Sequence, residues 1–235
     1  AKIFAPGIVS VKDRFELNAV FSPKGDEFYF SVETGDRAFM MFSKKVNGIW
    51  TKPEISPISD VPGEYTDVDM AFSADGNRFY FCTNRPVPWD PKPKLNIWYC
   101  TRKGNSWSKP FYLERPISSN ELELYPTFTD SGTMYFASTR AGGFGRKDVY
   151  FSEWKNGKFS DPVHLGPEIN SKNTEGDTYV SPAEDYMIVT SEKRPDGFGS
   201  ADLYISFRKK DGTWTPLKNM GKTINTNGVE FCPMV

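Results

Sequence analysis

The chain has 235 residues, a formal net charge of −1 and an aromatic content of 15%. This length suits one all-β domain of roughly 200–250 residues, and abundant aromatic side chains are typical of strands rather than helices. The near-neutral charge excludes an electrostatic case for nucleic acid or an anionic membrane as partner. No apolar run approaches the ~18 residues of a membrane span, and no signal peptide is recognisable, although a mature secreted chain would have lost one.

The N-terminal segment reads as a strand without its partners. Residues 4–10 match the tail of a later unit, L-G-P-E-I-N at 165–170. In that unit this tail follows a fourth strand. We therefore expect the chain to begin with a fourth strand whose first three strands lie elsewhere in the sequence.

Four complete copies of one four-stranded antiparallel unit follow, at intervals of 51 to 56 residues. The first strands end, before a tight turn, at Phe21, Phe72, Phe128 and Val180. Second strands are predicted at 27–32, 78–83, 133–138 and 186–191, and third strands at 39–43, 97–102, 149–153 and 203–207. Fourth strands open at Trp50, Trp107, Phe159 and Trp214. We expect the three tryptophans to pack in the core between neighbouring units.

The C-terminal residues 230–235 match a first strand that ends at Val235. The simplest arrangement is a single domain over 1–235, an all-β, five-bladed β-propeller of four-stranded antiparallel blades. The blades are expected at about 15–59, 66–118, 121–170 and 174–225, with the fifth split between 1–10 and 226–235. The N-terminal strand closes this fifth blade, which is incomplete at the C-terminus. From the repeat length, we expect about 25–40 residues to be missing after Val235.

A carboxylate stands five residues before the end of each first strand, the innermost strand of a propeller blade. These acids are Glu16, Asp67, Glu123, Glu175 and Glu230, with Asp69, Glu121 and Asp177 nearby. At a channel mouth they could bind a cation, or a cationic or hydroxylated ligand, and mutual repulsion would raise some of their pKa values. The alternative is structural, with each acid accepting hydrogen bonds from backbone or arginine groups of the neighbouring blade.

Other recurring residues follow the second strand. Arg85, Arg140 and Arg194 are expected either to pair with the acids or to face a ligand, since arginine suits bidentate carboxylate pairing. Buried, saturated arginines would indicate the structural role. Asp148 and Asp202 are expected to fix the turns of the Gly-rich loops 142–145 and 197–199 by accepting backbone N–H bonds. No helix follows either loop, which excludes a phosphate site of the helix N-terminal kind.

Three residue sets lie outside this pattern. Trp89, in the Pro-rich insertion 86–93, is the best hint of a contact surface, although loop packing is an equal alternative. The cysteines Cys82, Cys100 and Cys232 follow no metal-ligand spacing and are expected to act as small hydrophobic residues. A disulfide between Cys82 and Cys100, on neighbouring strands, stays open. The single histidine, His164, falls on a fourth strand, which disfavours a histidine-dependent catalytic or zinc site.

The combined motifs E-x-x-P-x-F, Y-F-x-S-x-R, G-G-F-G-x-x-D-V-Y and L-G-x-x-I-N resemble those of WD-repeat-like β-propellers of TolB type. The resemblance is closest to propellers of Bacteroidetes cell-envelope proteins. It covers essentially the whole chain and is strongest in the third and fourth units. It implies an extracytoplasmic scaffold or recognition role, periplasmic or secreted, and no particular reaction.

The favoured function is a non-catalytic, monomeric binding or scaffold module for a protein, a peptide or an envelope polymer such as a glycan or peptidoglycan. No cofactor is expected, apart from a cation that the channel mouth could hold. The alternative is a glycoside hydrolase-like enzyme that uses two channel-mouth carboxylates about 5–10 Å apart. A third interpretation, the propeller of a prolyl-oligopeptidase-type peptidase, requires a hydrolase domain that this sequence does not contain.

Overall fold

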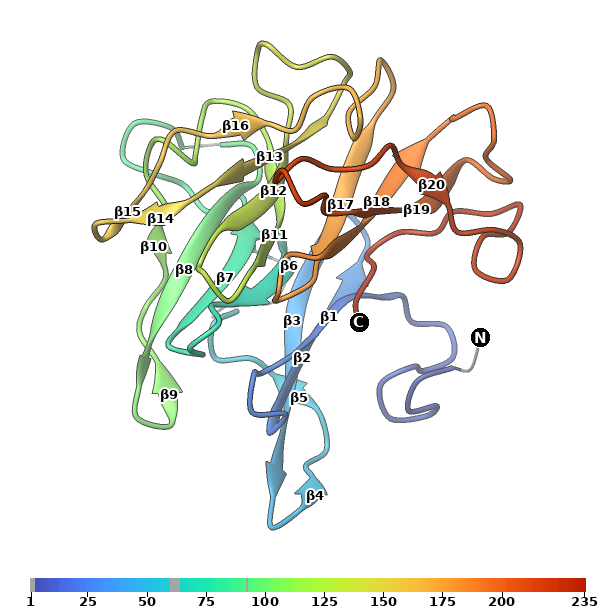
Figure 1. The fold of residues 1–235 in the computed structure, drawn as a ribbon. Helices are drawn as coiled ribbons and strands as arrows, with labels where there is room; N and C mark the ends of the chain where they lie inside the picture. Colours follow the sequence, from blue (N-terminus) through green and yellow to red (C-terminus); the bar gives the residue numbers. More distant parts are fainter. Residues whose placement is uncertain (1–2, 60–63, 92) are drawn as a thin grey trace. The chain divides into compact units, whose positions relative to one another are not determined.

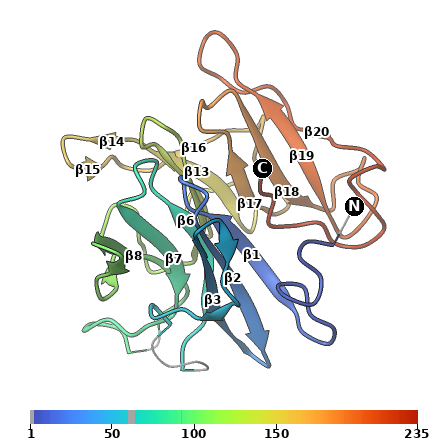
Figure 2. The same ribbon diagram turned by 90° about the horizontal axis from the view of Figure 1, so that it is seen from below.

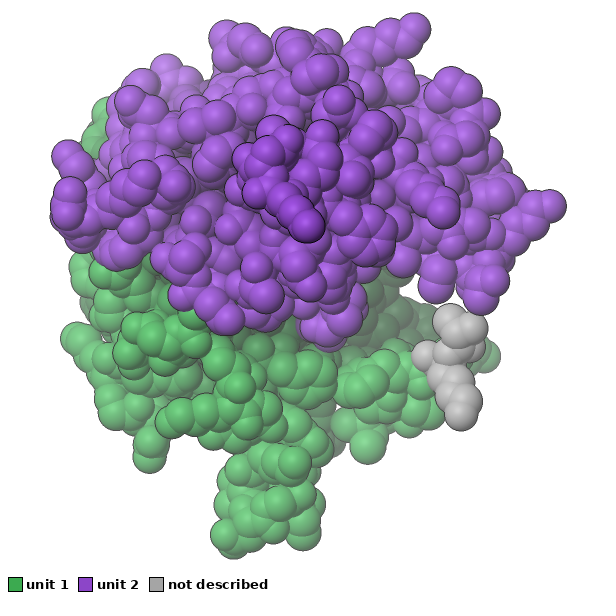
Figure 3. All heavy atoms as spheres, viewed as in Figure 1, with its two compact units in different colours: residues 1–113 green, residues 114–235 purple. Residues whose placement is uncertain are grey.

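A computed structural model describes residues 3–59, 64–91 and 93–235. Within these ranges the regular structure consists of β-strands, which form four antiparallel sheets of four or five strands and one small two-stranded sheet (Figure 1). The chain divides into two compact units, Ala1–Leu113 and Glu114–Val235 (Figure 3). Each unit is described by itself.

The first unit contains two sheets, each built in chain order. The first sheet contains β1 (Glu16–Phe21), β2 (Glu27–Thr34) and β3 (Arg37–Val46), with β4 (Ile49–Trp50) and β5 (Glu54–Ile55) paired to β3. The second sheet contains β6 (Asp67–Phe72), β7 (Arg78–Thr83) and β8 (Asn96–Lys103), with β9 (Ser106–Trp107) and β10 (Phe111–Tyr112) paired to β8.

The second unit repeats this plan, and its strands lie side by side in both views (Figures 1 and 2). One sheet contains β11 (Glu123–Phe128), β12 (Met134–Ser138), β13 (Asp148–Ser152) and β16 (Val163–His164). The small sheet pairs β14 (Trp154–Lys155) with β15 (Lys158–Phe159). The last sheet contains β17 (Glu175–Val180), β18 (Tyr186–Glu192), β19 (Ala201–Phe207) and β20 (Lys218–Asn219).

The four first strands end at the predicted residues, and the second and third strands lie within three residues of their predicted bounds. The fourth strands differ, because three of them are broken into two short pieces and the last consists of an isolated bridge at Trp214 followed by β20. A proline follows the opening aromatic residue in every unit, at Pro53, Pro110, Pro162 and Pro216. Proline has no N–H to donate to a ladder, so pairing stops there and resumes a few residues later.

The two predicted terminal strands are not formed in the described residues. The segment 4–10 has a single bridge between Pro6 and Ser10, and 230–235 has no assigned strand, although Val229 bridges Ala201. A strand requires a hydrogen-bonded ladder, and no neighbouring segment in the described chain supplies one. The first two residues of the predicted fifth blade lie outside the described ranges.

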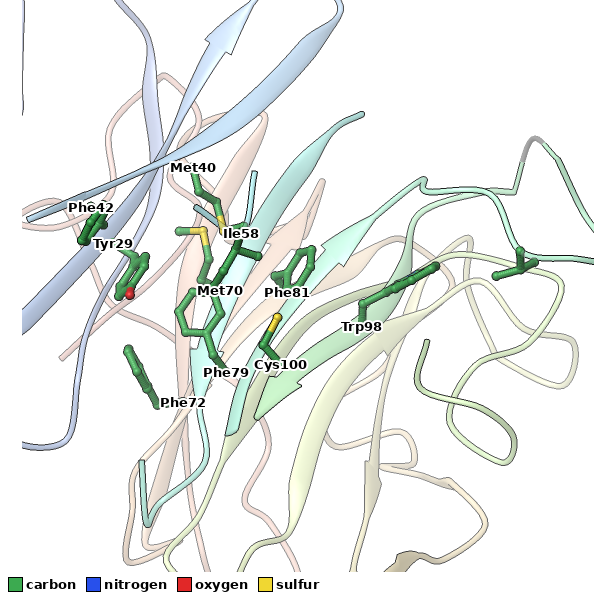
Figure 4. Packing of buried hydrophobic residues seen from close by; sticks show 11 residues of the cluster. Tyr29, Met40, Phe42, Ile58, Met70, Phe72, Phe79, Phe81, Trp98 and Cys100 are labelled. Atoms are coloured by element: carbon green, nitrogen blue, oxygen red, sulfur yellow. The ribbon is translucent and has the colours of Figure 1, made fainter. Parts of the chain in front are cut away.

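Aromatic residues link successive sheets inside each unit. In the first unit the Trp107 indole N–H donates to the Tyr29 hydroxyl at 3.0 Å, within a cluster that includes Met40, Phe79 and Phe81 (Figure 4). In the second unit Trp214 packs edge-on against Tyr135. These contacts confirm the predicted inter-repeat core.

Trp50 and the two buried cysteines occupy different environments in the first unit. Trp50 was expected to be buried like its counterparts, but its side chain is 38% exposed and packs on Phe21, so that prediction is wrong. Cys82 and Cys100 are fully buried, as small hydrophobic residues would be. They form no disulfide, because the register places Cys82 opposite Ile97 and Cys100 opposite Phe79.

The Gly-rich loops of the second unit dock each repeat onto the next. Asp202 accepts hydrogen bonds from the N–H groups of Phe198 and Gly199, as the turn-fixing role predicts, and Asp148 accepts one from Gly145. A Cβ on Gly199 would lie 2.1 Å from the Gly228 carbonyl oxygen. The glycine therefore permits a backbone approach that also lets Ser200 N–H donate to the same oxygen at 2.9 Å.

We predict that Gly199→Ala destabilises the second unit by about 1–3 kcal/mol, because the new methyl group overlaps backbone that cannot move aside cheaply. Ser200→Ala is the matched control, since Ser200 is the exposed neighbour and its change should stay within about 0.5 kcal/mol. Urea unfolding midpoints of both variants measure the difference. Equal midpoints would show that the loop does not make this close contact.

Candidate functional site

The repeated acid of the second sheet, Asp67, lies in a closed polar network in the first unit. It is buried and forms a bidentate ion pair with Arg85, and the Ser59 hydroxyl donates to it at 2.7 Å. The same guanidinium donates to the Ile58 carbonyl at 2.9 Å. Ser59 and Ile58 belong to the tail of the preceding repeat, so the pair ties two repeats together.

The same network recurs around Glu123 in the second unit. Glu123 is fully buried and accepts hydrogen bonds from the Ser119 hydroxyl at 2.6 Å and its N–H at 2.9 Å, and from Ser138 at 2.9 Å. Arg140 lies 3.2 Å from the carboxylate. It also donates to the carbonyl of Ile117, which precedes the Ser119 turn.

Glu175 repeats this arrangement in the last sheet. Ser171 contributes its N–H at 2.7 Å and its hydroxyl at 2.8 Å, Ser191 donates at 2.7 Å, and Arg194 lies 3.1 Å away. Arg194 also donates to the Ile169 carbonyl at 2.7 Å. The repetition of the same partners in two consecutive repeats indicates a structural element of the fold.

Glu16 is also paired with an arginine, but the arginine comes from a different position in the repeat. Its neighbour on the second strand is Val32, whose side chain cannot donate, and Thr34 stands where the next two repeats have Arg85 and Arg140. Arg14 replaces it, with 2.6 Å between its Nε and Glu16 and 2.6 Å between its Nη2 and the Val9 carbonyl. Sequence reasoning missed Arg14, because it precedes the acid instead of following the second strand.

Glu230 shows the motif in a partial form. It accepts hydrogen bonds from the Thr226 N–H at 3.0 Å and from its hydroxyl at 2.6 Å. In the part of the chain that the structure describes, no arginine pairs with this acid. The Ser or Thr four residues before each of Glu123, Glu175 and Glu230 is the sequence signal for this turn.

The arginines therefore show the saturated arrangement that the structural interpretation predicts. Arg85 is buried, and Arg140 and Arg194 are largely so, with guanidinium carbons 5.1–5.3 Å from aromatic ring centres. One detail of that interpretation is corrected. Each arginine comes from the sheet of its own acid, and the neighbouring repeat supplies hydroxyl, N–H and carbonyl groups instead.

Burial also raises the pKa values of the tyrosines beside these arginines. Loss of hydration raises the pKa of Tyr204, which lies against Arg194, to about 12. The pKa of Tyr150, beside Arg140, is raised by burial first and by the charge of Asp148 second. Both hydroxyls therefore stay neutral near pH 7 and serve as hydrogen-bonding or packing groups.

The additional acids have separate surroundings. The Glu121 N–H belongs to the Ser119 turn, at 3.0 Å from that hydroxyl. Asp69 sits at a bulge of the first strand with φ of 55°, a position that Asp177 occupies in the last sheet. Asp177 lies 3.8 Å from the Lys147 ammonium and 3.6 Å from the Cys232 sulfur.

Trp89 is held in place and yet exposed. Its ring packs edge-on against Tyr112 at 5.7 Å, and Tyr112 packs in the same way on Trp98 at 5.6 Å. Two backbone hydrogen bonds between Val87 and Asp90 close the turn that carries it. Its side chain is 66% exposed, so the loop presents a fixed aromatic surface to solvent.

His164 lies on the fourth strand β16, as predicted. Its Nδ1 accepts the Gly166 N–H at 3.1 Å, and its Nε2 lies 3.3 Å from Asp148. Among the described residues, no group of three or more His, Cys, Asp or Glu is arranged to hold a metal ion. The same residues contain no helix with the length and apolar character needed to cross a membrane.

We predict that Arg140→Met destabilises the second unit by roughly 3–5 kcal/mol, because it leaves the Glu123 carboxylate buried without its counter-charge. Adding Glu123→Gln should recover part of this loss. Lys155→Met is the control, since it breaks an exposed pair with Glu153 that is worth at most about 1 kcal/mol. Denaturant unfolding measures all three, and an Arg140→Met cost no larger than that of Lys155→Met would disprove the structural role.

Comparisons with known proteins identify the fold. No protein-family model matches the sequence, and no curated protein sequence matches it significantly. Several solved structures are similar. TolB from Acinetobacter baumannii has a TM-score of 0.55 at 13% identity, over 89% of this chain and 45% of TolB. A puromycin-hydrolyzing peptidase from Mycobacterium tuberculosis has a TM-score of 0.56 at 12% identity, over 87% of this chain and 29% of the peptidase.

A glycoside hydrolase is also similar, with a TM-score of 0.59 at 12% identity over 89% of this chain and 74% of that one. The chain spans less than half the length of TolB and of the peptidase. Identities this low carry no activity from one protein to another, and they show the fold alone. The chain is an all-β protein with a β-propeller fold, similar to the propeller domains of TolB and of prolyl oligopeptidases.

Proposed function

We propose that this chain is a non-catalytic, monomeric binding or scaffold module for a protein, a peptide or an envelope polymer such as a glycan or peptidoglycan. The observation that carries the proposal is the state of the repeated acids. Asp67, Glu123 and Glu175 are buried and bonded to arginine and hydroxyl groups of their own chain. The most regular polar groups of the molecule therefore hold the fold together, and recognition is left to exposed surfaces.

The enzymatic alternative requires something different from the same acids. A glycoside hydrolase needs two carboxylates about 5–10 Å apart that both reach the substrate. Of the four candidates, Asp67, Glu123 and Glu175 are at most 3% exposed, and Glu16 is paired with Arg14. None of these side chains is both unpaired and open to solvent, so the geometry favours binding over catalysis.

We also propose a five-bladed closure, with the fifth blade drawn from 1–10 and 226–235. The support is the fifth copy of the hydroxyl–acid turn, Thr226 to Glu230, which repeats the Ser119 and Ser171 turns. Gly199 packs on this copy as Gly145 packs on the Ser171 turn. The proposed extracytoplasmic location rests on the resemblance to TolB-type propellers.

The exposed Trp89 is the surface through which we expect the first contact with a partner. Fixed aromatic side chains give large contact areas at low entropic cost and dominate many interfaces. Peptidoglycan fragments, glycans and peptides should be screened for binding to the whole chain by biolayer interferometry. Glu123→Gln and Glu175→Gln should alter stability while leaving binding intact.

We predict that Trp89→Ala weakens the binding found in this screen by roughly tenfold or more. Phe207→Ala removes another exposed aromatic side chain, at the end of strand β19 and away from this loop, and serves as the control. Hydrolysis of a screened glycan, or the absence of any bound partner, would contradict the proposed function. Unchanged binding by Trp89→Ala would remove this loop from it.

A further inference from the structure

A small pocket of about 160 Å³ opens in the second unit, at the ends of β17 and β18. Its polar lining includes Lys147, Asp177, Thr190 and Glu192, and Val229 and Phe231 form an apolar side. All these residues lie in the same unit. The repeated acids that pair with arginine do not line this pocket, so the pocket is separate from the buried acid–arginine networks.

The pocket is where the last sheet departs from the repeat. Registers align Glu175 with Glu123 and Asp67, which places Gly176 where the other sheets have Leu124 and Val68. By the same registers, Thr190 stands where Ala137 and Cys82 stand. A glycine thus replaces a hydrophobic residue, and Thr190 brings a hydroxyl to a position where, of the other sheets, the first alone has one, on Ser31.

Lys147 fills the space that the missing side chain leaves. A Cβ on Gly176 would lie 2.6 Å from the Lys147 ammonium. The φ of Gly176 is not in the left-handed region, so this glycine is needed for the space it leaves and not for its backbone conformation. Lys147 itself replaces the alanine of the equivalent loop, Ala201. Its ammonium then lies 3.8 Å from Asp177.

The buried hydroxyl of Thr190 is an independent indication that the pocket binds a ligand. Its side chain is 8% exposed, and its hydroxyl has no hydrogen-bond partner. In the first sheet the equivalent hydroxyl, on Ser31, donates to the Asp67 carbonyl at 3.0 Å. A buried hydroxyl without a partner is costly. Among the described residues with an unpartnered buried polar atom, Thr190 is the one that lines this pocket, which points to a polar group that enters it.

The charge of the pocket indicates the sign of that group. Lys147 is opposed by Asp177, whereas Glu192 has no side-chain partner among the residues that the structure describes. Glu192 lies two residues after Thr190 on the same strand, so both side chains face the same side. The lining carries two carboxylates and one ammonium and therefore attracts a cation.

We propose that this pocket binds one organic ammonium group, the lysine side chain of a peptide partner. The inference rests on the proposed binding function and names its ligand. Glu192 pairs with the ammonium, Thr190 contributes its hydroxyl, and Val229 and Phe231 cover the methylene stem. A pocket below the ~300–1,000 Å³ of whole-ligand sites holds one side chain rather than an entire ligand.

We predict that Nα-acetyl-lysine amide shifts the backbone amide resonances of Thr190 and Glu192 in an NMR titration of the whole chain. The norleucine analogue, which lacks the ammonium, should not. Glu192→Gln and Thr190→Val should each weaken lysine binding by roughly 5–30-fold, the range of one or two kcal/mol. Glu168→Gln, an exposed carboxylate outside the pocket, is the matched control and should bind as the unaltered chain does.

Equal binding of the lysine and norleucine amides, or unchanged affinity in Glu192→Gln, would overturn the inference. A preference for glucosamine over the lysine amide would overturn the assignment to a peptide. Unfolding midpoints confirm that each variant is folded before it is titrated. If the chain binds partners in the surface screen but not the lysine amide, this inference fails and the proposed function stands, whereas no binding in either assay removes both.

Discussion

The structure depends on surrounding a buried carboxylate with hydrogen-bond donors inside a sheet protein. Removing a charged group from water costs several kcal/mol unless donors surround it. At Glu123 those donors are Ser119, Ser138 and Arg140. The arginine has more N–H groups than one carboxylate needs, and it also donates to the Ile117 carbonyl of the preceding tail. Satisfying one charge therefore fixes the position of the preceding tail against the next sheet.

The first repeat shows that the constraint concerns charge balance and not a particular sequence position. Val32 stands where other repeats have a hydroxyl, and Thr34 stands where the next two repeats have an arginine. Arg14 reaches Glu16 from the other side and still donates to a tail carbonyl, that of Val9. Two unrelated positions give the same two arginine contacts, one with the acid and one with a carbonyl of the preceding tail, because both bring a guanidinium between them.

This explains what could be predicted from sequence. The ends of the first strands, such as Phe72, were predictable because a hydrophobic residue directly precedes a turn signal. The broken fourth strands could have been predicted in the same way, because a proline follows each opening aromatic residue. The exposure of Trp50 could not, since it depends on which groups lie nearby rather than on the local pattern. The acids and arginines were recognised, but their pairing within one sheet follows from a register, Asp67 opposite Thr83, that the sequence does not display.

Specialised positions of a repeat protein are found where one repeat differs from the others in its side chains or its bonds. Ser31 and Thr190 carry the same hydroxyl at the same register, but only Ser31 finds its carbonyl. The glycine at 176 and the lysine at 147 change together, because the lysine side chain occupies the volume that the glycine vacates. Ordinary drift in a packed core would keep this volume apolar, since a buried polar group without a partner destabilises the fold. The charge that Lys147 brings is balanced within the unit by Asp177, whereas the Thr190 hydroxyl is left for a group that enters the pocket, which is why the proposed ligand is placed there.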